Sequence, residues 1–187
     1  MFSSHSRLAL VALVSALATG CAIQAPPYQP SLDNVEILKK SASPAALGNF
    51  TVQAGGAGVV SISLRGSGMN SPVGTDYAAY LANALSQELQ LAGKLDAKSK
   101  VVITGLLIKN DISAGGFSTN SGEIEAQFTV IVDGQERYRG THRVELTWDS
   151  SLIGAVAIPK AQQQYPMLVQ RLLIQLMADT RFQAALK

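Results

Sequence analysis

The sequence predicts an α+β fold, a two-layer sandwich in which two main helices pack on one face of a mostly antiparallel sheet. Three observations predict this fold. Apolar and polar residues alternate over residues 122–132, as they do in a half-buried strand. Asp133-Gly134, directly after this segment, is typical of a tight hairpin. Two segments, one beginning at Tyr77 and one containing Tyr165, carry apolar residues at helical spacing on either side of the hairpin.

Short strands are predicted in the first part of the chain, over residues 34–39, 49–53 and 59–64. Residues 66–75 (GSGMNSPVGT) predict a turn-rich loop. Asp76 is placed to cap the helix that begins at Tyr77, and Gly93 is placed to end it.

The second part of the chain predicts three strands followed by a helix. Residues 100–109 and 122–132 predict neighbouring strands, joined by a polar, glycine-rich connection over 110–121, and residues 137–148 predict the return strand. Polar residues opposite the apolar row predict a solvent-exposed sheet face: Glu123, Glu125, Gln127 and Thr129. One apolar face defines the last helix: Tyr165, Leu168, Val169, Leu172, Leu173, Leu176 and Met177.

The composition is that of one domain with few charges. The chain has 187 residues, of which 47% are hydrophobic and 15% are charged, whereas an average domain has roughly 25% charged residues. The net charge is only +2, and aromatic residues make up 6%. Because nucleic-acid binding relies on basic patches and stacking rings, we expect no nucleic-acid partner.

The N-terminal segment predicts export. Arg7 precedes an uncharged apolar run over residues 8–18, and small residues follow before Cys21. A positive head, an apolar run of this length and a small-residue boundary are typical of a signal peptide. The run is too short to cross a bilayer, which takes about 20 apolar residues.

Leu17-Ala18-Thr19-Gly20-Cys21 resembles the bacterial lipobox. The resemblance implies that the chain is cleaved before Cys21 and that lipid is attached to its thiol. The usual pattern places leucine three residues before cysteine, where this chain has Ala18 and carries Leu17 one position earlier. Cys21 is the only cysteine, so in an oxidising compartment it has no disulfide partner within the chain.

Ala22 stands where members of the lipobox family retained in the inner membrane often carry aspartate. The resemblance therefore implies a lipid anchor on the periplasmic face of the outer membrane, with anchoring in the inner membrane or a soluble periplasmic form as alternatives. The expected organisation is a signal peptide over residues 1–20, an acylated cysteine with a proline-rich tether over 21–32, and a single periplasmic α+β domain over 33–187.

No motif of the sequence predicts catalysis or a cofactor. After cleavage His142 is the only histidine, and zinc sites need clustered nitrogen and sulfur ligands. A triad of His142, Asp149 and Ser150 lacks the G-x-S-x-G elbow that would accompany it. Glu123 and Glu125 share a strand face, which is more simply a solvated surface than a glycosidase pair. We therefore expect a protein that is not an enzyme.

An apolar stretch over residues 152–158 has two interpretations. It is either a buried connection laid across the sheet or an exposed loop that meets lipid or a protein partner. Its large apolar residues are Leu152, Ile153, Val156 and Ile158.

Around this stretch, Trp148-Asp149-Ser150-Ser151, Ile153-Gly154-Ala155 and Ala157-Ile158-Pro159 resemble a set of uncharacterised proteobacterial lipoproteins. The layout is also loosely similar to that of small accessory lipoproteins of envelope lipid transport. The resemblance implies only the class and location, an envelope lipoprotein. The anchor, the tether and the lack of a catalytic set lead us to expect an accessory or adaptor that binds an envelope protein. A carrier or sensor of lipids or other small amphiphiles is the alternative.

Overall fold

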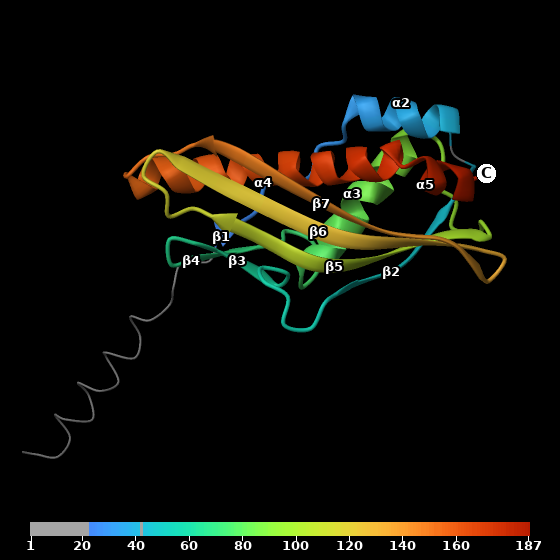
Figure 1. Ribbon diagram of the computed structural model, residues 1–187, viewed down its shortest axis with the longest axis horizontal. Helices are drawn as coiled ribbons and strands as arrows, with labels where there is room; N and C mark the ends of the chain where they lie inside the picture. The colour runs from blue at the N-terminus through green and yellow to red at the C-terminus, as the bar shows by residue number, and fades with distance from the viewer. Residues whose placement is uncertain (1–22, 42) are drawn as a thin grey trace, which may run out of the picture.

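The structure, a computed structural model, describes residues 23–41 and 43–187, so Cys21 and the predicted signal peptide lie outside the described residues. Strands and helices form an elongated body (Figure 1). The elements in chain order are β1 (Ile23–Gln24), α2 (Leu32–Ser41), β2 (Ala46–Val52), β3 (Ser61–Leu64), β4 (Ser67–Asn70), α3 (Tyr77–Leu91), β5 (Val101–Ser113), β6 (Thr119–Val132), β7 (Gln135–Asp149), α4 (Gly154–Ala178) and α5 (Thr180–Ala185).

The main sheet has four strands in the order β2-β5-β6-β7. Strands β5, β6 and β7 are antiparallel to one another, while β2 runs parallel to β5. The strands extend further than predicted, because backbone pairing continues through polar positions such as Asp111↔Glu123 and Ser113↔Ser121. The connection between β5 and β6 is therefore residues 114–118 rather than 110–121.

The hairpin between β6 and β7 turns at Asp133 and Gly134, as predicted. Both residues have positive φ, 50° and 80°. Positive φ at both central positions is the mark of a type I′ turn, whose twist matches that of the flanking strands.

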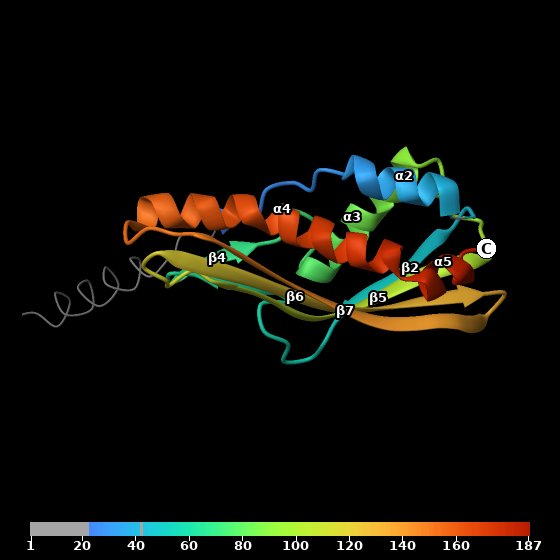
Figure 2. The ribbon, with the colours of Figure 1, turned by 45° about the horizontal axis from the view of Figure 1, so that its top comes forward.

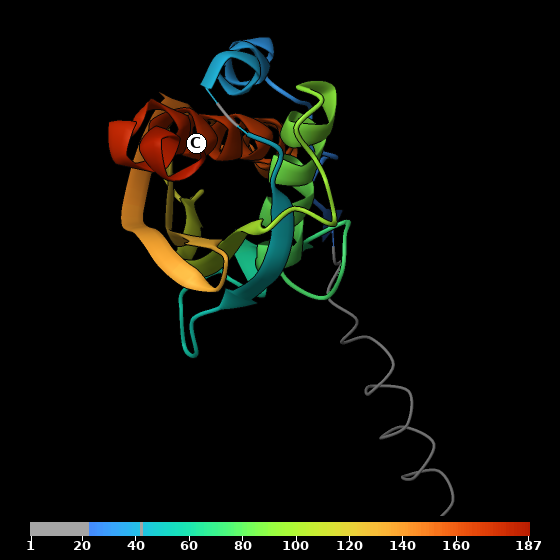
Figure 3. The ribbon, with the colours of Figure 1, turned by 90° about the vertical axis from the view of Figure 1, so that its right-hand side faces the viewer.

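Helices α3 and α4 cover one face of this sheet, and α2 lies on the outer side of both helices (Figures 2 and 3). The buried layer includes Ile124, Phe128 and Val130 of β6, which alternate with half-exposed polar residues of the opposite face. The predicted α+β sandwich with one polar sheet face is confirmed.

A second, smaller sheet has the order β1-β4-β3. The sequence predicts residues 66–75 as loop only, and this prediction is wrong for β4, which pairs with β3 and with β1. The Tyr77 hydroxyl at the start of α3 donates to the carbonyl of Met69 at 2.8 Å. The small sheet is thereby joined to the first turn of α3.

The prediction of a strand over 34–39 is also wrong, since these residues form part of α2. Val35 and Leu38 are buried, and residues three apart share one face of a helix. Short apolar runs suit a strand or a helix equally well, so packing on α3 and α4 decides the outcome.

The tether predicted before this helix packs on the domain over its described part. Ala25 and Tyr28 are buried, and Leu32 already begins α2. The Tyr80 hydroxyl of α3 donates to the carbonyl of Pro26 at 2.9 Å. The folded body thus begins at residue 23.

Both main helices occupy the predicted segments; α3 begins at Tyr77 and ends just before Gly93, as predicted, whereas α4 begins earlier than predicted. The Asp76 carboxylate accepts a hydrogen bond from the backbone N–H of Ala79 at 3.0 Å, so the predicted cap of α3 is confirmed. Helix α4 already begins at Gly154 and includes Pro159 and Pro166. The sequence did not predict this early start, because Gly154 and Pro159 are residue types that disfavour helix interiors.

Candidate functional site

The apolar stretch over 152–158 forms the loop before α4 and the first turns of this helix. Leu152, Ile153 and Val156 are 66%, 63% and 52% exposed, while Ile158 is half-buried against the core. The interpretation as a buried connection is therefore wrong for the first three residues, whereas Ala157 and Ile158 pack inward.

Phe117, which sequence reasoning missed, lies in the neighbouring connection between β5 and β6. Its ring is 76% exposed. The backbone N–H of Ser150 donates to the carbonyl of Ser118 at 2.7 Å, so the two connections lie side by side. We call Phe117, Leu152, Ile153 and Val156 the apolar tip. In the sequence, Phe117 could have been singled out as a lone aromatic residue in a glycine-rich, uncharged loop.

Arg65 of the β3–β4 turn holds the two connections together. Its guanidinium donates to the carbonyls of Ala114 at 2.7 Å, Leu152 at 2.8 Å and Ser151 at 2.7 Å, and more weakly to that of Gly116 at 3.2 Å. Hydrogen bonds from a charged donor are about twice as strong as neutral ones. One side chain thus determines how both connections present their apolar residues.

The two segments that form the tip, residues 112–122 and 150–159, contain no ionisable side chain. The nearest charges in the sequence are Asp111, Glu123, Asp149 and Lys160, at the edges of these segments. Four exposed apolar side chains on an uncharged surface form a patch of the kind that meets another apolar surface.

The chain enters the domain beside this tip. Strand β1 runs parallel to β4, with Ile23 opposite Met69, so β1 is entered from the side of Ser67 and the β3–β4 turn that carries Arg65. The side chain of Gln162 in α4 donates to the carbonyl of Gln24 at 3.1 Å. The first described residues therefore lie between the β3–β4 turn and the early part of α4.

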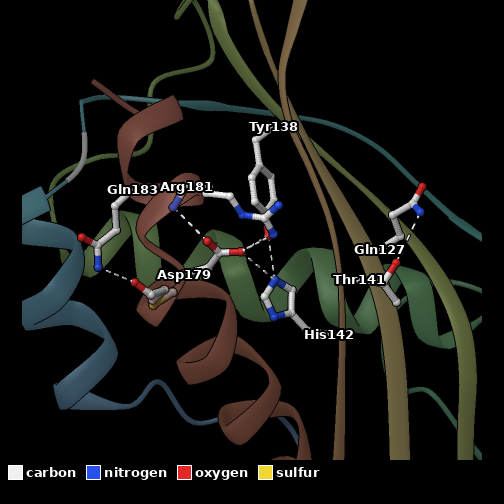
Figure 4. Close-up of polar contacts among 8 residues, drawn as sticks. Gln127, Tyr138, Thr141, His142, Asp179, Arg181 and Gln183 are labelled. Carbon is white, nitrogen blue, oxygen red and sulfur yellow. Dashed lines mark hydrogen bonds and ion pairs between the residues drawn. The ribbon is translucent and has the colours of Figure 1, made fainter.

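A second cluster, the polar cluster, joins β7 to the junction of α4 and α5 (Figure 4). It consists of Tyr138, His142, Asp179 and Arg181. The Tyr138 hydroxyl lies 3.0 Å from Asp179 Oδ2 and 2.7 Å from His142 Nε2, and Arg181 pairs with Asp179 at 3.2 Å.

Proton placement in this cluster follows from the charge of Asp179. Burial raises the pKa of Asp179, but hydrogen bonds from Arg181 and Tyr138 lower it more, to about 2. The ionised carboxylate only accepts hydrogen bonds, so the Tyr138 hydroxyl donates its hydrogen bond to Asp179, and His142 Nε2–H donates to the same hydroxyl oxygen. Burial lowers the pKa of His142, although the charge of Asp179 raises it in part, and the lowered pKa favours a neutral ring.

The residues considered for catalysis are not brought together. His142 and Asp149 lie on β7 seven residues apart, which is roughly 23 Å along an extended strand. Glu123 instead forms ion pairs with Lys109 and Arg143, both at 2.8 Å. Among the described residues no group of histidine, cysteine and carboxylate side chains could hold a metal ion.

No family model matches the sequence, and no curated protein matches it. A solved structure of a Xanthomonas campestris protein from a domain family of unknown function is similar, with a TM-score of 0.56 and 12% identity over 88% of this chain and 97% of that chain. A candidate lipoprotein from Caulobacter crescentus has a TM-score of 0.46 and 13% identity, over 82% of this chain and 96% of that chain. A minor lipoprotein from Acinetobacter baumannii has a TM-score of 0.45 and 10% identity, over 75% of this chain and 91% of that chain. The first likeness shows a shared fold.

Within residues 23–41 and 43–187, no helix combines the length and apolar character needed to cross a bilayer.

Proposed function

We propose that this chain is a lipid-anchored protein of the bacterial envelope that acts, without catalysis, as an accessory or adaptor of an envelope assembly or transport complex. One observation carries the proposal. Cys21 directly follows a predicted export signal, in a segment that resembles a lipobox, and the folded domain begins only two residues later, at Ile23. Ala22 favours the periplasmic face of the outer membrane.

The interior of the described domain supports an adaptor over a carrier. A carrier needs a pocket between its layers. In this domain the rings of Tyr77 and Tyr80 from α3 contact that of Tyr165 from α4, with centroids 5.0 Å and 5.1 Å apart, and all three side chains are buried. Aromatic side chains occupy the layer that a bound amphiphile would use.

The edge of the main sheet offers a surface for a protein partner. Strand β7 is 15 residues long and forms one edge of the four-stranded sheet. Edge strands present unpaired backbone groups, and pairing with a strand of another chain is a common mode of recognition. We place the partner contact on this strand.

Metabolic labelling with an acyl probe tests the anchor. The wild-type protein should take up the probe and sediment with membranes, and Cys21→Ser should lose both properties. Ser31→Cys, made in the Cys21→Ser background, is the control for a thiol near the N-terminus without a lipobox, and it should take up no probe. Continued labelling of Cys21→Ser would overturn the anchor.

Photocrosslinking in intact cells tests the adaptor role. A photoreactive residue at the exposed position Glu145 of β7 should capture a defined envelope protein. The same residue at exposed Gln163 of α4 is the control. Equal capture from both positions, or none from Glu145, would count against a partner on the sheet edge.

A further inference from the structure

We infer that the apolar tip is a second membrane contact, at which Phe117, Leu152, Ile153 and Val156 enter the boundary between headgroups and acyl chains of the leaflet that holds the lipid anchor. This inference rests on the proposed acylation of Cys21. It names the surface of the domain that faces the bilayer.

The length of the chain before β1 brings the tip to the bilayer. Only Ala22 separates Cys21 from Ile23, and a chain spans at most about 3.6 Å per residue. An acylated thiol therefore lies within roughly 10 Å of β1. Because β1 is entered from the side of the β3–β4 turn, the anchor and the Arg65 turn share one end of the domain.

The shape of the domain allows only one end to face the leaflet. The connection between β5 and β6 and the start of α4 lie at one end of the long axis, whereas the β6–β7 hairpin and the C-terminus lie at the other (Figures 1 and 2). With a short link at the first end, the apolar tip meets the bilayer while Gln135 of the hairpin is held away from it.

The chemistry of the tip suits a lipid surface. An aromatic ring and three aliphatic side chains are exposed together, and the segments that carry them have no charge that would have to be desolvated. The one cation beneath them, Arg65, donates four hydrogen bonds to backbone carbonyls, so its polar atoms are satisfied within the protein. Membrane-binding surfaces of peripheral proteins bury apolar side chains roughly 5–10 Å into this boundary.

Quenching by brominated lipids tests the inference on the mature, acylated protein. The protein is reconstituted in vesicles of phosphatidylethanolamine and phosphatidylglycerol without other proteins. Single variants Phe117→Cys and Ile153→Cys carry a bimane label, and acylated Cys21 leaves no other thiol in the chain. Gln135→Cys is the matched control at an exposed position at the start of β7, beside the hairpin turn at the other end.

The labels at positions 117 and 153 should be quenched about threefold more strongly than the label at 135, since only the first two reach the acyl boundary. A second measurement uses unacylated Cys21→Ser protein, whose weak binding to the same vesicles should fall about tenfold in Leu152→Asp/Ile153→Asp.

The outcomes separate the tip from the anchor. Unquenched labels at 117 and 153 on protein that takes up the acyl probe would overturn the tip contact and leave the anchor intact. Failure of Cys21 to take up the probe would overturn the proposed anchor and, with it, this inference. Shielding of the two labels only in native membranes, and not in protein-free vesicles, would make the tip a protein interface instead and would also overturn the inference.

Discussion

Asp179 connects two parts of the fold through a single carboxylate. It caps α5 by accepting a hydrogen bond from the backbone N–H of Arg181 at 2.8 Å, and it accepts a hydrogen bond from the hydroxyl of Tyr138 in β7. His142 completes the chain of hydrogen bonds on the sheet side. The polar cluster therefore fastens the C-terminal helix to the sheet, and its polar groups are partners of one another.

Gly140 makes room for this cluster. It lies two residues after Tyr138 on the same side of β7, and a Cβ atom at position 140 would lie only 2.0 Å from the Tyr138 hydroxyl oxygen. Only a residue without a side chain allows the Tyr138 ring to fold over the strand and reach Asp179.

We expect Gly140→Ala to lower the free energy of unfolding by about 1–3 kcal/mol, because the added methyl displaces the Tyr138 hydroxyl from its partners. Urea denaturation measures the change. Gly115→Ala is the matched control, since a Cβ there meets nothing within 4 Å, and its effect should stay within about 1 kcal/mol. Equal effects of the two substitutions would show that the clash with Tyr138 is unimportant.

At the scale of elements, three connections depend on Arg65. The β3–β4 turn carries it at a φ of 51°, and its guanidinium reaches both the β5–β6 connection and the loop before α4. A non-glycine residue at positive φ is uncommon and is held by its surroundings. The hydrogen bonds to four carbonyls supply that constraint.

Arg65→Lys should loosen both connections, because a lysine ammonium is a compact donor that cannot reach carbonyls spread around a planar guanidinium. Hydrogen exchange should become about tenfold faster over 114–118 and 150–153, and the free energy of unfolding should fall by about 2 kcal/mol. The β6–β7 hairpin, far from Arg65, should exchange at the wild-type rate. Unchanged exchange in the two connections would contradict the role of Arg65.

At the scale of the whole molecule, buried Glu88 joins the N-terminal segment to α3. Its carboxylate accepts hydrogen bonds from the Tyr28 hydroxyl, the backbone N–H of Ser31 and the side chain of Asn34, the last two at 3.1 Å. Burial raises the pKa of Glu88, although these hydrogen bonds lower it in part. The N-terminal segment that leads to the proposed anchor is thus held by the carboxyl group of Glu88, whose ionised form is disfavoured by burial.

The raised pKa of Glu88 predicts a pH dependence. The unfolded chain loses this proton at lower pH than the folded one, so the contribution of Glu88 to stability is full below its unfolded pKa and is lost as pH rises through its folded pKa. Glu88→Gln cannot ionise and should become more stable relative to wild type as pH increases.

Urea denaturation of both proteins between pH 4 and pH 8 measures this difference. His142 is present in both, so its opposite pH dependence cancels when the two free energies are subtracted at each pH. A difference that does not vary with pH would contradict the shift of Glu88.

Local patterns were sufficient where one face of an element is buried. The alternation over residues 122–132, the Asp133-Gly134 turn and the Asp76 cap of α3 each involve neighbours in sequence, and the structure confirms all three. Packing of distant segments decided the rest. Residues 34–39 became helical because α3 and α4 bury Val35 and Leu38, and Pro159 is accommodated within α4.

By itself, the sequence determined the α+β class and predicted an exported chain with a candidate lipid anchor at Cys21, since both depend on short-range periodicity and composition. Only the tertiary structure decided that residues 23–31 belong to the domain and that Phe117 joins Leu152, Ile153 and Val156. The physical reason is the set of long-range hydrogen bonds of Arg65 and Glu88, which link residues more than 45 positions apart and leave no local trace in the sequence.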